Sequence, residues 1–304
     1  MVKKTMYDIQ IFFIKQLLLV TNSLSWEFSY KLGHLLGLII YYSGFRKKVA
    51  MVNLDIVYGN TKTQKHKQNI LKKSSINLGH VVINYLRLPY VESSFWKKNC
   101  RITNEKTLKK LLAKKKGVAI ISGHFGMWDL GIGKLGHSDY NFSVIGKRIR
   151  NQAINEMVLD SRKRLKMRNL MNKNVMDTII NILKNGGIVG IAVDQRIQKS
   201  KGVFLNWMGR PASSVKSTSY IVRETGASVL SAYMVQHGPR EFELIIGDEI
   251  TWEKYPEDPE KELLINSQKQ ADVVQKFILK KPELWFWMHK RWKIHPDKKS
   301  NPYL

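Results

Sequence analysis

Two short apolar runs, residues 118–122 and 188–193, each follow a glycine and are dominated by valine, isoleucine and alanine. Continuous apolar runs of this length are typical of strands that are buried on both faces of a parallel sheet. Similar runs at 142–145, 229–235 and 242–246 are predicted to form further strands.

Between these runs, apolar positions recur three or four residues apart, which is typical of helices that pack one face on a sheet. Predicted helices cover residues 64–87, 103–116, 152–166, 176–184, 214–224, 259–280 and 282–292. The alternation of strands and helices predicts an α/β fold with a mixed, mostly parallel central sheet flanked by helices.

The first 45 residues have a different pattern. An apolar run at 9–20 is interrupted by Lys15, and a second at 26–45 is followed at once by the basic residues 46–48. Crossing a bilayer takes about 20 apolar residues, so helices that lie in the membrane interface fit this pattern better. A buried core helix is the alternative for residues 26–45. We expect residues 1–45 to be a membrane-anchoring helical segment, without a cleaved signal peptide, and residues 46–304 to be one catalytic domain.

Charge and cysteine content narrow the class of protein. The chain has 51 Lys and Arg against 24 Asp and Glu, a net charge of +27, which predicts a polyanionic partner such as nucleic acid, anionic lipid or an acidic carrier protein. A hydrophobic content of 43% excludes a disordered basic tail. The single cysteine, Cys100, excludes an internal disulfide and fits a reducing compartment. The histidines show no metal-ligand spacing, so we predict neither a metal nor a cofactor.

The segment after the strand at 118–122 carries the candidate chemistry. It reads Gly123-His124-Phe125-Gly126-Met127-Trp128-Asp129 and connects that strand to a helix. Moving an acyl group from a thioester to a hydroxyl needs a base and a group that fixes the tautomer of the base. His124 is the candidate base and Asp129 its candidate orienting acid, while the helix start offers NH groups to an oxyanion. The alternative is that His124 only caps the turn and Asp129 only decorates the start of a helix.

A second polar pair, Asp194-Gln195, follows the strand at 188–193 in the same way. The carboxyl ends of parallel strands form the crevice in which open α/β sheets bind ligands. We therefore expect His124 and Asp194 to face one site.

Several segments, taken in order, resemble the lipid A biosynthesis acyltransferases, the lauroyl and myristoyl transferases of the bacterial inner membrane. That family's motif is similar to Gly123–Asp129 here, although Met127 stands where its members often carry a polar residue. Further similarities cover almost the whole chain, at residues 46–54, 145–147, 194–195, 202–212 and 282–293. Each is weak alone, but their order and spacing together are specific.

The resemblance implies roles for further residues. Arg162 and Lys147 would bind substrate, Arg162 through a phosphate or a phosphopantetheine arm. Asp194 would hold a cation or order the acceptor sugar, with a turn-forming aspartate as the alternative. Gln195 would bind substrate, and Arg210 would contact phosphate. For Arg162 and Arg210, a solvated charge is the alternative.

The resemblance also implies the substrates and the location. The acyl donor would be acyl carrier protein and the acceptor a hydroxyl of a phosphorylated glycolipid, the lipid A precursor, in late acylation. The enzyme would lie among membrane lipids on the cytoplasmic face of the inner membrane and bind no nucleic acid.

Two other functions stay open from sequence. The first is an acyltransferase that takes its acyl chain from coenzyme A and acts on another glycolipid or phospholipid. The second is a basic nucleic-acid-binding protein without catalysis, which the charge and the aromatic carboxyl-terminal run would allow.

Overall fold

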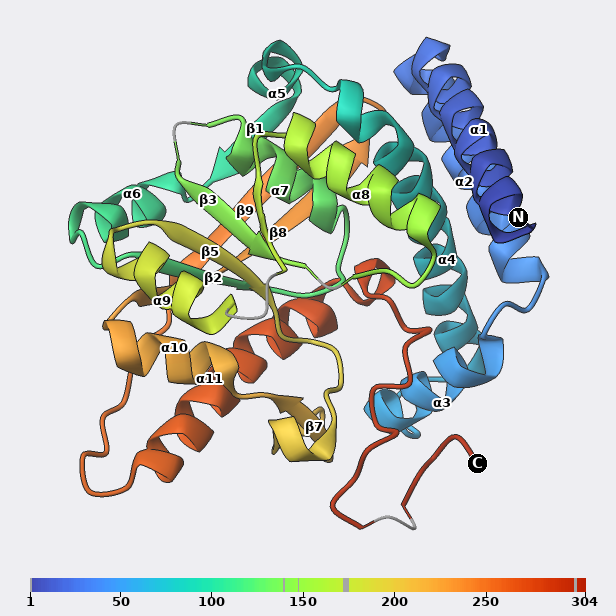
Figure 1. Ribbon diagram of the computed structural model, residues 1–304. Coiled ribbons are helices and arrows are strands. Elements are labelled where there is room, and N and C mark those ends of the chain that lie inside the picture. Colours follow the sequence, from blue (N-terminus) through green and yellow to red (C-terminus); the bar gives the residue numbers. More distant parts are fainter. Residues whose placement is uncertain (1, 139, 147, 172–174, 298–299) are drawn as a thin grey trace.

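A sheet of seven strands forms the centre of the protein (Figure 1). The computed structural model describes residues 2–138, 140–146, 148–171, 175–297 and 300–304. The strand order is β1-β9-β8-β2-β5-β3-β4, and all neighbours run parallel except β8 and β9. The strands are β1 (Cys100–Thr103), β2 (Val118–Ser122), β3 (Phe142–Ile145), β4 (Arg168–Leu170), β5 (Ile188–Ala192), β8 (Ser228–Gly238) and β9 (Glu241–Glu249). The predicted mixed, mostly parallel sheet is thus confirmed.

Helices cover both faces of the sheet because the side chains of a buried strand alternate between the two faces. Ala119 and Ile121 of β2 belong to one buried cluster, whereas Val118 and Ile120 belong to another. The first cluster includes residues of α9 (Val175–Lys184), α10 (Ser217–Thr225) and α11 (Pro259–Lys280), and the second includes residues of α5 (Ser93–Asn99), α6 (Glu105–Ala113) and α7 (Trp128–Gly136). The helix α8 (Gln152–Arg164) follows β3 and lies near α7 in Figure 1.

Some boundaries differ from the sequence prediction. The expected helix 103–116 is shorter, because Thr103 still belongs to β1. A hairpin of β6 (Gly202–Trp207) and β7 (Arg210–Val215) occupies a stretch for which no strand was predicted, and α10 begins only after it.

The predicted helix 282–292 is wrong. Only a single 3₁₀ turn, Pro282–Leu284, forms there, and an irregular chain follows. The reason is that Trp285, Trp287 and Trp292 are all buried in the core, so the segment has no polar face to present to solvent. Within this segment, the Trp287 indole donates a hydrogen bond to the Pro282 carbonyl.

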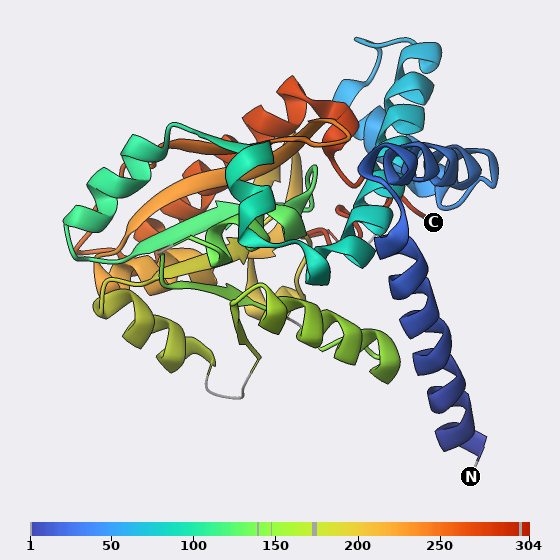
Figure 2. The same cartoon turned by 90° about the horizontal axis from the view of Figure 1, so that it is seen from above.

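The amino-terminal segment forms two helices, α1 (Val2–Ser23) and α2 (Trp26–Tyr42). Figure 2 shows α1 extending away from the sheet. Among the described residues, no helix combines the length and the apolar character needed to cross a membrane. Large apolar side chains nevertheless lie exposed along both helices, namely Ile9, Phe12, Phe13, Leu17, Leu19, Val20, Phe28, Leu35, Ile39 and Tyr42.

Glycines bring α2 into backbone contact with α4 (Gln64–Arg87). A Cβ on Gly79 would lie 2.1 Å from the carbonyl oxygen of Gly33, and a Cβ on Gly37 would lie 2.3 Å from the Cα of Ile76. No side chain larger than hydrogen fits at these positions without moving a helix. A further helix, α3 (Lys47–Tyr58), leads from α2 to α4.

Candidate active site

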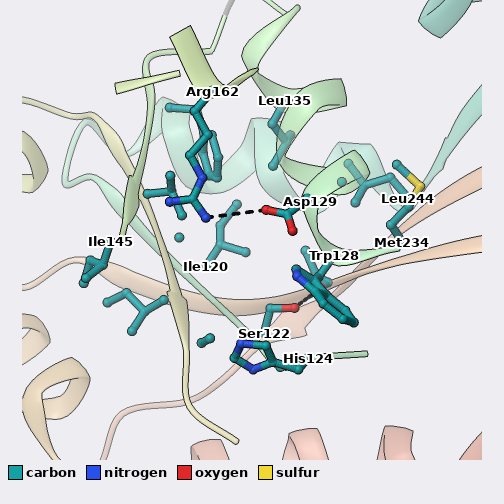
Figure 3. A pocket seen from close by; sticks show the side chains of 18 residues that line it. Ile120, Ser122, His124, Trp128, Asp129, Leu135, Ile145, Arg162, Met234 and Leu244 are labelled. Carbon is teal, nitrogen blue, oxygen red and sulfur yellow. Dashed lines mark hydrogen bonds and ion pairs between the residues drawn. The ribbon is translucent and has the colours of Figure 1, made fainter. Parts of the chain in front are cut away.

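A pocket of about 140 Å³ lies at the carboxyl end of β2 and continues beneath α7 (Figure 3). Its inner part is apolar and is lined by Ile120, Leu135, Phe142, Val144, Ile191, Met234 and Leu244. Its polar lining consists of Ser122, His124, Asp129 and Arg162. The pocket therefore offers a hydrophobic interior next to a cluster of polar side chains.

The turn after β2 presents His124 to this pocket. Gly126 has a φ of 55°, which favours glycine, and a Cβ there would lie 2.2 Å from the Met234 carbonyl oxygen. A Cβ on Gly123 would meet the carboxylate carbon of Asp194 at 3.0 Å. Both glycines are therefore needed for the close approach of the turn to β8 and to Asp194.

Asp194 is the hydrogen-bond partner of His124. Its Oδ1 lies 2.9 Å from Nδ1 of His124, and its Oδ2 accepts from the His124 backbone NH at 2.9 Å. The Trp285 indole donates to the same Oδ2 at 2.9 Å, and Asp194 is 1% exposed. With Nδ1–H donated to Asp194, Nε2 of the neutral ring is the atom left to accept a proton.

The electrostatics of this pair favour its charged form. Burial opposes the imidazolium, but the nearby Asp194 carboxylate outweighs burial and raises the pKa of His124 above its ordinary value. Burial likewise opposes the Asp194 carboxylate, but His124 and the Trp285 hydrogen bond outweigh it, so the pKa of Asp194 is lowered. Asp194 is thus a permanent anion that holds one ring tautomer of His124.

Asp129, the orienting acid expected from sequence, does not make this hydrogen bond. It faces Arg162 of α8, with Nη2 of Arg162 3.5 Å from its Oδ1, as Figure 3 shows. Arg162 also donates to Oδ1 of Asn169 at 2.7 Å. Burial raises the pKa of Asp129, although Arg162 and His124 oppose that shift. The expected hydrogen bond goes to Asp194 because β5 places that residue beside the β2 turn, whereas α7 directs Asp129 toward α8.

Backbone NH groups at the turn are largely occupied. The NH of His124 donates to Asp194, that of Phe125 to the Gly123 carbonyl, that of Gly126 to the Leu284 carbonyl and that of Met127 to the Met234 carbonyl. These four groups, which precede the first helical residue Trp128, cannot serve as oxyanion donors. Arg162, whose side chain lines the pocket, is a donor that can.

The other residues predicted from sequence lie in different places. Gln195 is half-buried beside Asp194, and Arg210 lies on β7, where it donates to the Ser300 carbonyl at 2.6 Å. Neither lines the pocket. Lys147 lies outside the described residues. The Trp285 contact to Asp194 was missed, since the sequence pattern suggested a helix there.

The fold places a histidine with a buried aspartate partner beside an apolar pocket, and the comparisons with known proteins give the class of the enzyme, an acyltransferase. The sequence model of the family "Bacterial lipid A biosynthesis acyltransferase" matches residues 2–294. The chain belongs to this family, which confirms the resemblance seen in its motifs and gives it a role in lipid A acylation.

Two similar proteins of known name are also lipid A biosynthesis acyltransferases. The chain is 22% identical to the lipid A biosynthesis palmitoleoyltransferase of Escherichia coli (strain K12) over 261 residues, which cover 85% of this chain and 82% of the relative. It has the same identity and coverage with the lipid A biosynthesis acyltransferase of Shigella flexneri.

Proposed function

We propose that this enzyme transfers a fatty acyl chain from acyl carrier protein to a hydroxyl of a lipid A precursor, at the cytoplasmic face of the bacterial inner membrane. The observation that carries the proposal is the hydrogen bond of 2.9 Å between His124 and the buried Asp194, beside an apolar pocket. The net charge of +27 suits an acidic carrier protein and a phosphorylated acceptor.

In the proposed mechanism, Nε2 of His124 removes the proton of the acceptor hydroxyl as its oxygen attacks the thioester carbonyl. The carbonyl oxygen gains negative charge, which Arg162 stabilises through its guanidinium. The intermediate then collapses, the carbon–sulfur bond breaks, and the imidazolium returns its proton to the leaving thiolate. Asp194 stays ionised throughout and stabilises the imidazolium.

Asp129 has a supporting role in this scheme. Its carboxylate lies beside Arg162 and holds that guanidinium at the pocket, while its negative charge contributes to the raised pKa of His124. Gln195, next to Asp194, would order the acceptor.

The inner pocket would hold the acyl chain of the donor. Leu135 lies more than one turn of α7 beyond Asp129, and Phe142 lies at the amino-terminal end of β3, away from the strand ends that carry the polar site. These two side chains therefore bound the part of the pocket that is farthest from His124.

Replacing Leu135 with phenylalanine is expected to shift donor preference toward shorter acyl chains, because the added bulk shortens the pocket. Competition between donors of different length, read by mass spectrometry of the product, measures the shift. Leu135→Met, which conserves volume, is the control and is expected to keep the original preference. Unchanged preference in a folded Leu135→Phe enzyme would place the acyl chain elsewhere.

The exposed apolar side chains of α1 and α2 would form the membrane-docking face within residues 1–45. Phe12 and Phe13 are 57% and 65% exposed, and the basic residues 46–48 follow α2 directly. Apolar side chains inserted between headgroups, with cations against lipid phosphates, are the usual means of interfacial binding.

Changing Phe12 and Phe13 together to aspartate is expected to lower binding to vesicles of anionic phospholipid by about tenfold or more per residue, because each apolar ring then no longer leaves water. Vesicle flotation measures the loss. Leu264→Asp, at an exposed apolar residue of α11, is the matched control and should bind as the unchanged protein does. Equal binding of all three proteins would refute a docking face on α1.

The proposed reaction is tested by incubating the purified full chain with a lipid A precursor and either acyl carrier protein or coenzyme A that bears the same acyl chain. We expect an acceptor heavier by one acyl group, formed faster from the carrier protein. Faster transfer from coenzyme A would reassign the donor, and transfer only to other glycolipids or phospholipids would reassign the acceptor.

A further inference from the structure

A group of arginines lies on the side of His124 where Asp194 is. Arg196 follows Asp194 by two residues, on the loop after β5. In the part of the chain that the structure describes, Arg196 makes no hydrogen bond or ion pair, and its Nε is buried. A half-buried guanidinium without a partner is unfavourable, so such a group calls for a ligand that completes its hydrogen bonds.

Two further arginines share this environment. Arg210 uses Nη2 to bond the Ser300 carbonyl, but its Nε is buried without a partner. Arg291 is fully buried, donates to the Ser213 carbonyl and the Ser214 hydroxyl, and lies 4.3 Å over the Trp207 ring. None of the three forms an ion pair with a carboxylate of the described residues, so their positive charges are not neutralised pairwise.

Hydrogen bonds place the three arginines in one region. The Ser213 hydroxyl, on the same strand as Arg210, donates to the carbonyl of Ile197 at 2.8 Å. Ile197 follows Arg196 directly, and Arg291 donates to the Ser213 carbonyl at 2.7 Å.

Burial raises the pKa of the Tyr303 hydroxyl to about 12, and the charges of Arg291, Arg210 and Arg196 all act against that rise. The contacts agree, since the NH of Trp292, next to Arg291, donates to the Tyr303 hydroxyl at 3.1 Å, and Arg210 bonds the carbonyl of Ser300, three residues before Tyr303. Tyr303 itself is held by Asn53, whose Oδ1 accepts from the Tyr303 hydroxyl at 2.5 Å.

His289 lies on the segment that connects this group to His124. The backbone NH of Arg291 donates to the His289 carbonyl at 2.8 Å, and the NH of Phe286, three residues before His289, donates to the His124 carbonyl at 3.1 Å. Nδ1 of His289 is buried without a partner among the described residues, and burial lowers the pKa of His289 to about 4, so the ring is neutral at pH 7. The charges of Asp194, Arg291, Arg196 and His124 all act on it as well. Asp194, the carboxylate whose charge acts on His289, is already paired with His124 and forms no ion pair with these arginines.

We propose that Arg196, assisted by Arg210 and by the charge of Arg291, binds a phosphate group of one substrate while the reacting end of that substrate lies at His124. The proposal rests on the proposed acyl transfer and adds a second anion site to it, separate from Arg162. A guanidinium pairs with phosphate through two parallel hydrogen bonds, which fits a cation that has its donors free. The phosphate could come from the phosphopantetheine arm of the donor or from the acceptor glycolipid.

The test compares the unchanged enzyme with Arg196→Gln in four reactions. The donor is acyl phosphopantetheine or acyl pantetheine, which lacks the phosphate, and the acceptor is the lipid A precursor or its dephosphorylated form. We expect kcat/KM of Arg196→Gln to fall roughly ten- to a hundredfold with the substrate whose phosphate is bound, mostly through KM, and to match the unchanged enzyme when that phosphate is removed. The substrate that abolishes the difference identifies the source.

Arg223→Gln on α10 is the matched control, since Arg223 already pairs with Glu224 at 3.3 Å, and it should behave as the unchanged enzyme does. Arg196→Lys keeps the charge without the fork and should recover part of the loss. A deficit of Arg196→Gln that is equal in all four reactions, or no deficit in any, would overturn the inference. Absence of transfer by the unchanged enzyme from any donor would instead refute the proposed function.

Discussion

Enzyme carrying His124→Gln is expected to lose acyl transfer by a factor on the order of a hundred to ten thousand, the contribution typical of a positioned general base. The reason is that glutamine can occupy the turn and accept a hydrogen bond but cannot take up the hydroxyl proton. The loss should fall on kcat, because the apolar pocket that binds the chain remains. Steady-state kinetics with acyl carrier protein as donor measures it.

The loss of activity can be assigned to the missing base only if the His124→Gln enzyme is folded. His124→Gln should unfold at about the temperature of the unchanged enzyme and still bind the acyl donor, since the side chain of position 124 is 32% exposed and the glutamine amide can donate to Asp194 in place of the imidazole. His66→Gln, at an exposed histidine of α4, is the control and should retain full activity. Full turnover by His124→Gln would remove the base from the mechanism.

Asp194→Asn is expected to reduce kcat by a similar order and to change the pH dependence. In the unchanged enzyme the Asp194 charge raises the pKa of His124, so activity should fall as the pH drops through that raised value. Without the charge, only the smaller contribution of Asp129 opposes burial, so the pKa of His124 should fall. The acid limb of the pH profile should therefore move to lower pH while the plateau falls, because asparagine no longer holds the productive tautomer.

Asp129→Asn separates the two candidate orienting acids. Asp129 is a minor contributor to the pKa of His124, so its loss should move the acid limb much less than Asp194→Asn does. Its main effect should come through Arg162, which loses its carboxylate partner. A large shift for Asp129→Asn and none for Asp194→Asn would return the orienting role to Asp129.

The sequence predicted the sheet well where the signal was local. Short apolar runs bounded by glycine, such as 118–122, can be recognised without knowing their neighbours, because burial on both faces leaves no polar position. The strands β4 and β7 carry no such run, and the apolar run after Gly202 in β6 is only three residues long. They form because neighbouring segments provide hydrogen-bond partners, which one stretch of sequence does not reveal.

The candidate site was likewise predicted only in part from the sequence. The repeated arrangement of a polar residue after a buried strand led us to expect Asp194 and His124 at one site, and β2 and β5 are indeed paired. Which acid meets the imidazole depends on the direction of two side chains across that pair, whereas Asp129 was favoured only by its closeness in sequence. The tryptophans at 285–292 misled the prediction because burial, not helical periodicity, determines their spacing.

The glycine contact between α2 and α4 has a mechanical consequence. Helices whose backbones touch have no side chains between them that could change rotamer and let one helix shift against the other. We therefore expect α2 and α4 to move together as one rigid unit. On α4, the Ser74 hydroxyl bonds the Trp285 carbonyl, and the Trp285 indole bonds Asp194. A lipid-facing α2 would therefore hold the His124 imidazole at a fixed height and tilt relative to the bilayer surface.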